Sequence, residues 1–252
     1  MPDLTPDILP KIQENRLAEL RLSGNFIYPD YGELSIMALP ASIASLLDAP
    51  PFPSPELSAE LLAPVSGDVK RVIWILVDAL AFTRLRLWLD QHPDLVWNDL
   101  LSAGVLAPIT SLAPSTTSTC LPSMWSGLSP AEHGFVGYEL WLKEYGVVAN
   151  MIKHSPFQID HRPGLLEMAG FDPAVAMPSQ NLGSHLSTAG IGVHTFQHIS
   201  IYRSGLSRLF LKENSSHSFV STSDLWANLV ATVGREDREK NLHWIYWGDV
   251  DY

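Results

Sequence analysis

The feature that most constrains the fold is the run RVIWILV at residues 71–77, which ends directly before Asp78. Its apolar, β-branched residues favour a strand that is buried on both faces, as in a parallel sheet. The next segment, residues 81–93, places Phe82, Leu85 and Leu89 on one helical face. A buried strand followed by an amphipathic helix is typical of the beginning of an α/β fold.

Strand-like and helical segments continue to alternate along the chain. We expect two short helices, one that begins at Leu39 and one that contains Met124 and Leu128. A further helix is expected over 224–240, with Asp224 as its N-cap. We also expect strands over 105–114, 191–197 and 242–247, and a helix over 180–190. This alternation predicts a mainly parallel sheet with helices on both faces. We expect residues 71–252 to form this core, and residues 1–70 an N-terminal extension that is partly extended and proline-rich.

Composition excludes several classes of protein. The chain has 16 Lys+Arg against 27 Asp+Glu, a formal charge of −11, which disfavours nucleic acid as a structural partner. A small phosphorylated substrate is still compatible with this charge, because bound cations reverse the field locally. A single cysteine, Cys120, excludes internal disulfides and cysteine-based zinc clusters. With no signal-like start and no membrane-length apolar run, we expect a cytoplasmic protein without a membrane partner. The oligomeric state stays undefined.

Polar residues follow three of the predicted elements at the edge where an α/β sheet carries its reactive groups. Asp78 ends the first strand and either binds a cation or caps the next helix. Thr117 lies where a strand gives way to a helix, so its hydroxyl is either a nucleophile activated by a metal or one of several capping hydroxyls. Asp249 and Asp251 follow the last strand and either hold a divalent cation or form a solvated turn.

Other reactive side chains have simpler interpretations. Nothing near Cys120 indicates a lowered thiol pKa, so a small buried side chain is favoured over a nucleophile. We interpret His133, which precedes a glycine, as a structural hydrogen-bonding residue. The elements predicted for His185, His194 and His198 disperse them and argue against a metal cluster.

Three segments together resemble the alkaline phosphatase superfamily, in its branch of type I phosphodiesterases and nucleotide pyrophosphatases. They are VDAL at 77–80, PSTTSTCLPSMWSGLSPAEHGFVGY at 114–138 and YWGDVDY at 246–252. The second segment carries the family's Pro-then-Thr nucleophile motif, its Ser-Gly-Leu turn and its His-Gly pair. The resemblance implies an alkaline phosphatase-like core.

The resemblance also implies a two-metal hydrolysis of phosphate mono- or diesters. Asp78 and Thr117 would hold one divalent ion and Asp251 would hold the other, with zinc expected and manganese or magnesium as alternatives. Thr117 would be phosphorylated transiently, and water would then release the phosphate. Tyr138 stands where the nucleotide pyrophosphatases have a phosphate-contacting asparagine, so their substrate preference does not transfer.

Alternatives remain open at this point. The family's later histidine and aspartate ligands would follow Tyr252, which favours a non-catalytic truncated remnant or a partner-binding fragment as the second hypothesis. On that view the last strand, 242–247, would be left at an exposed edge of the sheet. A haloacid-dehalogenase-like phosphatase built on Asp249 and Asp251 ranks last.

Overall fold

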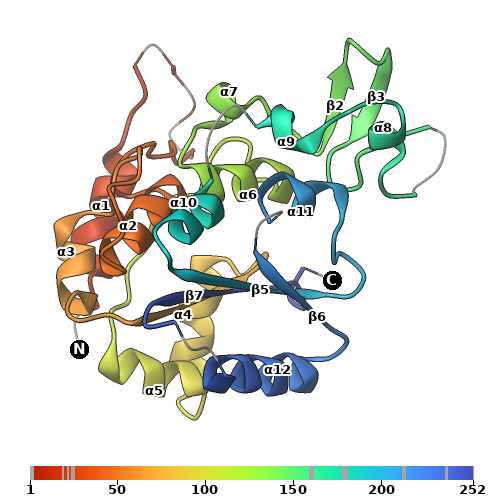
Figure 1. Cartoon of the computed structure of the whole chain (residues 1–252). Coiled ribbons are helices and arrows are strands. Elements are labelled where there is room, and N and C mark those ends of the chain that lie inside the picture. The colour runs from red at the N-terminus through yellow and green to blue at the C-terminus, as the bar shows by residue number, and fades with distance from the viewer. Residues whose placement is uncertain are drawn as a thin grey trace.

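The computed structural model describes residues 3–18, 20–21, 23, 26–158, 162–177, 181–211, 214–235 and 238–251. Among these residues, four strands form a parallel sheet (Figure 1). In spatial order they are β1 (Arg71–Val77), β7 (Asn241–Trp247), β5 (Gly192–His198) and β6 (Ser215–Phe219). The predicted α/β class with a parallel sheet is therefore confirmed.

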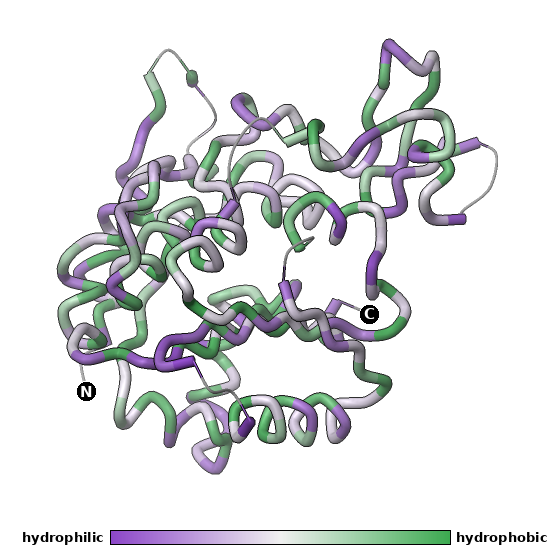
Figure 2. Tube along the Cα trace, in the orientation of Figure 1, coloured by the Kyte–Doolittle hydropathy of each residue, from purple (hydrophilic) through white to green (hydrophobic). Residues whose placement is uncertain are grey.

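Helices cover both faces of the sheet (Figure 1). One layer contains α4 (Phe82–Gln91), α5 (Val96–Ala103) and α12 (Thr222–Arg235). The other contains α2 (Leu39–Leu46), α6 (Thr117–Ser126), α10 (Leu182–Thr188) and α11 (Gly205–Phe210). The tube of α12 in Figure 2 alternates between hydrophobic and hydrophilic colours, as expected for a helix with one face on a sheet.

Alternate residues of β7 belong to different core clusters because successive strand side chains point to opposite faces. Trp244 packs with Trp125 of α6 at 5.3 Å between ring centroids. Ile245 packs in a separate cluster with Leu225 and Leu229 of α12. Trp74 of β1 joins the first group, 5.8 Å from Trp125. These tryptophans therefore attach α6 to the sheet.

The remaining elements surround this core. Helical segments are α1 (Thr5–Glu14), η1 (Ile36–Ala38), α3 (Ala59–Leu62), η2 (Ala63–Val65), α7 (Pro130–His133), α8 (Leu165–Met168) and α9 (Pro173–Ala176). A small antiparallel sheet contains β2 (Glu139–Leu142), β3 (Val147–Asn150) and β4 (Ser155–Pro156). Helix α2 contributes Ile43 and Leu47 to the main core, so part of residues 1–70 packs with it. The boundary at residue 70 stays a prediction.

Two strand predictions are wrong in detail. Residues 105–114 form no strand; Leu106 and Thr110 make only isolated bridges, to Asp3 and Ser35. Prolines interrupt this segment and remove the amide donors that a ladder needs. Strand β1 lies at the edge of the described sheet and is not buried on both faces, since Ile73 is 48% exposed.

The expectation of an exposed last strand is also wrong. Strand β7 lies between β1 and β5 and is hydrogen-bonded to both. Residues 241–245 are all buried. The crossover connections of a parallel sheet allow the last strand to insert between earlier ones, and this order cannot be read from a linear pattern.

The N-cap predicted for the last helix is displaced. Helix α12 begins at Thr222, and the hydroxyl of Ser221 accepts a hydrogen bond from the Asp224 amide at 3.2 Å. Asp224 thus lies in the first turn, where its negative charge still suits the helix dipole. No helix in the described part of the chain is both long and apolar enough to cross a lipid bilayer.

Gly127 ends α6 in a conformation and a space that only glycine fits. Its φ is 70°, in the left-handed region, and its amide bonds the Ser123 carbonyl at 2.8 Å. A Cβ at this position would lie 2.4 Å from the Cβ of Ser54. Gly134 has φ 81° but nothing within 4 Å of such a Cβ. A side chain at Gly134 would therefore add backbone strain alone, whereas a side chain at Gly127 would add both strain and a steric clash.

We predict that Gly127→Ala lowers the free energy of unfolding by about 3 kcal/mol, because strain and clash add. Gly134→Ala is the matched control and should lower it by about 1 kcal/mol, because only the strain applies. Urea denaturation of both variants measures the difference. Equal losses would show that the contact with Ser54 carries no energetic cost.

Candidate active site

The candidate site lies at the carboxyl end of β1 and β7. Asp78 follows β1 directly, and its amide donates to the Trp247 carbonyl at 3.0 Å, which extends the parallel ladder by one bond. This pairing brings the Asp78 side chain beside Tyr246. The Tyr246 hydroxyl donates a short hydrogen bond to Asp78 Oδ2. Strand register therefore places a carboxylate and a phenol in contact at this edge.

Thr117 reaches the same carboxylate from the helical layer. It is the first residue of α6, and its Oγ1 donates to Asp78 Oδ2 at 3.1 Å. The alternative interpretation, in which Asp78 and Thr117 cap the helices that follow them, is therefore wrong. Helix α4 begins at Phe82 with Ala81 at the N-cap, so Asp78 is not its cap. The Thr117 hydroxyl bonds a side chain across the site instead of capping its own helix.

Tyr246 is fixed as a hydrogen-bond donor by its surroundings. Burial first, and then the hydrogen bond and charge of Asp78, raise the pKa of the Tyr246 hydroxyl well above its ordinary value. The negative charge of Asp251 raises this pKa further. Because the phenol stays protonated, Asp78 Oδ2 accepts from two hydroxyls at once, those of Tyr246 and Thr117.

Two cavities meet at Thr117 and Tyr246, which line both of them. One, of about 590 Å³, also contains Asp78 and Cys120 on its wall. The other, of about 340 Å³, is lined in addition by Tyr138, Asp249, Asp251 and His198. The structure thus places Asp78, Tyr138 and Asp251 on the walls of two cavities that share Thr117. Their roles in metal or substrate binding stay predictions.

The two acidic residues after β7 have different surroundings. Asp249 Oδ2 accepts a hydrogen bond from the Thr222 hydroxyl at 3.0 Å, which ties the turn to the start of α12. The amide of Asp251 bonds the Gly248 carbonyl at 3.0 Å and closes the turn. Both carboxylates are exposed and line the cavity next to Thr117. Of these two hydrogen bonds, that of Asp249 is made by its carboxylate and that of Asp251 by its backbone amide.

His133 has the structural role expected of it. Its Nδ1 accepts from the Phe135 amide at 3.0 Å, so the proton of the neutral ring is on Nε2, which lies 2.9 Å from the Ser123 hydroxyl of α6. Burial lowers the pKa of His133 to about 4. The neutral ring thereby joins the turn after α6 to the helix that carries Thr117.

His185 lies on α10, and His194 and His198 lie on β5. His185 bonds the Pro50 carbonyl at 2.7 Å, and His194 stacks on His243 at 5.0 Å. Among the described residues, no three His, Cys, Asp or Glu side chains are grouped so that they could hold a metal. Burial raises the pKa of the Cys120 thiol, which agrees with a small buried side chain and disfavours a thiolate nucleophile.

Sequence reasoning missed Tyr246 and the contribution of His198 to this site. His198 ends β5 and lines the cavity beside Thr117. Its Nδ1 accepts from the Ser200 amide at 3.3 Å, so the neutral ring carries its proton on Nε2. The signal available in the sequence was position: both residues lie at the carboxyl ends of predicted strands. Strand order was needed to decide that these ends meet.

Comparison with known proteins agrees with this geometry. Residues 72–190 match the family described as type I phosphodiesterase / nucleotide pyrophosphatase. Over this segment the chain is similar to that family. The resemblance inferred from the sequence is confirmed, and it includes Asp78, Thr117 and Tyr138. The matched segment ends before β5 and β7, so Tyr246 and Asp251 lie outside the match. No curated protein and no solved structure matches the chain.

We predict that His133 contributes to the stability of the folded protein and that this contribution is lost in acid. Its pKa is 6.5 in the unfolded chain and about 4 in the folded protein, so the unfolded state binds the extra proton between these values. The contribution is complete above pH 6.5 and is lost as the pH falls toward 4.

Urea denaturation at about pH 7 and about pH 5 measures this loss. The wild type should lose about 2 kcal/mol more than His133→Gln does between these conditions. His92→Gln, at an exposed histidine, should behave as the wild type. An equal pH dependence in the wild type and His133→Gln would contradict the assignment.

Proposed function

We propose that this chain is a metal-dependent hydrolase of phosphate mono- or diesters that acts through a phosphorylated Thr117. The observation that carries the proposal is the 3.1 Å hydrogen bond from Thr117 Oγ1 to Asp78 Oδ2. It joins the two family residues, from different layers of the fold, at one edge of the sheet. The similarity of residues 72–190 to the family supports hydrolysis as the reaction class.

The position of Thr117 suits attack on a phosphate. It is the first residue of a ten-residue helix, where backbone amides and the helix dipole favour an anion. A threonine hydroxyl attacks poorly until it loses its proton. In the structure the Thr117 hydroxyl donates to Asp78, and because a neighbouring carboxylate disfavours the alkoxide, loss of the hydroxyl proton would depend on a cation held by the same two residues.

The donor set suits divalent cations. Two oxygen ligands of one tetrahedral zinc ion lie about 3.3 Å apart, close to the separation of Thr117 Oγ1 and Asp78 Oδ2. We propose that these two residues hold one ion and that Asp251 contributes to a second, with zinc first and manganese or magnesium as alternatives. Such ions, when bound, lower the pKa of a hydroxyl and neutralise the charge of a phosphate.

The walls around Thr117 indicate where the substrate would lie. Tyr138 is 47% exposed and shares the cavity with the apolar side chains Ile152 and Ile201. We propose that the Tyr138 hydroxyl donates to a phosphate oxygen and that the apolar wall contacts the esterified group. The partner is thus a small phosphorylated molecule. A cytoplasmic location stays a prediction.

We predict that Thr117→Ala lowers kcat/KM for p-nitrophenyl phosphate and bis-p-nitrophenyl phosphate by at least about 1,000-fold, because the nucleophile is lost. Thr116→Ala is the matched control. Thr116 occupies the N-cap position of the same helix without a side-chain capping bond, so its loss should leave the activity within a few-fold. Assays with added Zn²⁺ or Mn²⁺ measure both.

An acid-quenched reaction followed by mass spectrometry should show a phosphoryl group on the peptide that contains Thr117. Equal activity of Thr117→Ala and Thr116→Ala would refute the role of Thr117. Absence of activity in the wild type with every added metal would instead favour the non-catalytic alternative.

The two acidic residues after β7 give a second matched pair. Asp251→Asn should lower the activity at least about 100-fold and raise the Zn²⁺ concentration that gives half-maximal activity, because a ligand charge is lost. Asp249→Asn should keep most of the activity. Because the asparagine oxygen can still accept from Thr222, the weaker hydrogen bond should cost less than about 1 kcal/mol of stability. Metal titration of both variants is the measurement, and the reverse order of effects would exchange the two assignments.

A further inference from the structure

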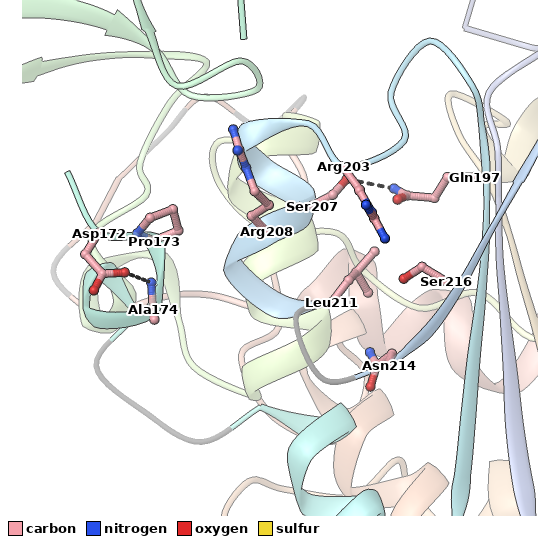
Figure 3. A pocket seen from close by; sticks show the side chains of 10 residues that line it. All are labelled: Asp172, Pro173, Ala174, Gln197, Arg203, Ser207, Arg208, Leu211, Asn214 and Ser216. Carbon is pink, nitrogen blue, oxygen red and sulfur yellow. Dashed lines mark hydrogen bonds between the residues drawn. The ribbon is translucent and has the colours of Figure 1, made fainter. Parts of the chain in front are cut away.

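A further cavity is lined by residues of β5, of α11 and of the segment that joins them (Figure 3). It has a volume of about 400 Å³, enough for a small metabolite. Helices α9 and α11 and strands β5 and β6 contribute to its wall. Its described lining shares no residue with the two cavities at Thr117, so it is a separate site.

Arg203 brings a positive charge to this cavity that no described carboxylate neutralises. Its guanidinium lies over the ring of Tyr202, with the guanidinium carbon 5.1 Å from the ring centroid. Arg208, the other lining arginine, pairs with Glu167 at 2.9 Å. In Figure 3 the Arg203 side chain extends toward Ser216 and Leu211, whereas Arg208 points away from them. A cation free to bind an oxyanion therefore faces the cavity.

The side-chain amide of Asn214 belongs to the wall of the same cavity. Both its Oδ1 and its Nδ2 are buried without a hydrogen-bond partner. Helix α10 leaves room for this amide, because a Cβ on Gly183 would lie 2.5 Å from Oδ1. A buried amide without partners is destabilising, so a ligand with hydroxyl groups would recover lost hydrogen bonds.

Further polar groups in the wall are held in fixed directions. Gln197 and Ser207 are both buried, and the Gln197 amide donates to the Ser207 hydroxyl at 2.9 Å. The Ser216 hydroxyl accepts from Thr195 at 3.1 Å, which leaves its own proton to donate. This set of fixed amides and hydroxyls matches a ligand with several hydroxyl groups.

We propose that this cavity binds a small polyhydroxylated anion, with its phosphate or carboxylate on Arg203 and its hydroxyls on Asn214, Ser216 and Gln197. Sugar phosphates and sugar acids have this chemistry. Asp172 lies at the opposite end of the cavity, where its Oδ1 already accepts from the Ala174 amide at 2.8 Å. The anionic group would therefore be directed to the Arg203 end and away from Asp172.

Calorimetric titration of the full chain in EDTA tests the site without metals at Thr117. The probes are ribose 5-phosphate, gluconate and neutral ribose. We expect at least one anion to bind with a Kd below about 1 mM and ribose to bind at least tenfold more weakly. If ribose 5-phosphate binds more tightly, the site recognises a phosphate; if gluconate binds more tightly, it recognises a carboxylate.

Arg203→Ala should raise the Kd of the preferred anion at least tenfold. Arg84→Ala, which removes an exposed arginine from α4, is the matched control and should leave the Kd within twofold. Asn214→Ala should also weaken binding while circular dichroism and the thermal midpoint confirm that each variant is folded. Thr117→Ala should bind as the wild type.

Three results would overturn the proposal. The first is no heat from either anion up to about 10 mM. The second is an unchanged Kd in Arg203→Ala. The third is loss of binding in Thr117→Ala, which would place the anion in the other cavity. None of these depends on the proposed hydrolase activity, because no turnover is measured.

Discussion

The parallel pairing of β1 with β7 is the interaction on which the candidate site depends. It aligns Val77 with Trp247 and continues into the bond from the Asp78 amide to the Trp247 carbonyl. Because the two strands are in register, Tyr246 is held beside Asp78 and the turn that carries Asp251 follows at the same edge. A shift of one residue would turn every side chain of β7 to the opposite face and separate these groups.

The second requirement is a fixed position for α6 above this edge. Trp125 packs between the sheet and α11, at 5.3 Å from Trp244 and 5.5 Å from Phe210. At the same, C-terminal end of the helix, Gly127 permits close approach of the segment around Ser54, and His133 bonds Ser123. The Ser-Gly-Leu and His-Gly motifs therefore hold α6 in place and do not themselves contact the Thr117 hydroxyl. Within this motif Thr117 is the proposed reacting group, and Gly127 and His133 support the helix that carries it.

Charge explains why this site would need cations. The chain has a formal charge of −11, and Asp78, Asp249 and Asp251 lie around Thr117. A phosphate ester entering such a site is repelled unless positive charge is supplied. In the cavity lined by Arg203, the protein itself would supply that charge. The two proposed sites would thus provide positive charge for an anion by different means.

The sequence by itself determined the fold class, the first helix of the core and the three polar positions Asp78, Thr117 and Asp251. These follow from local physics: a continuous apolar run, a helical period and a family motif of fixed spacing. The Ser-Gly-Leu turn was likewise visible in the motif, although its steric reason at Ser54 was not.

Only the tertiary structure decided the order of the strands. The apolar pattern of residues 242–247 is equally suited to an edge and to a central strand, and contacts with both β1 and β5 settled it. The same pairing selected Tyr246 as the partner of Asp78, and it left Ile73 of β1 half exposed at the edge of the described sheet. Residues 105–114 had the hydrophobicity of a strand, but no neighbouring strand supplied a continuous ladder. Hydrogen bonds between strands join residues far apart in the chain, so their partners are set by packing of the whole core and not by the local pattern that each strand carries.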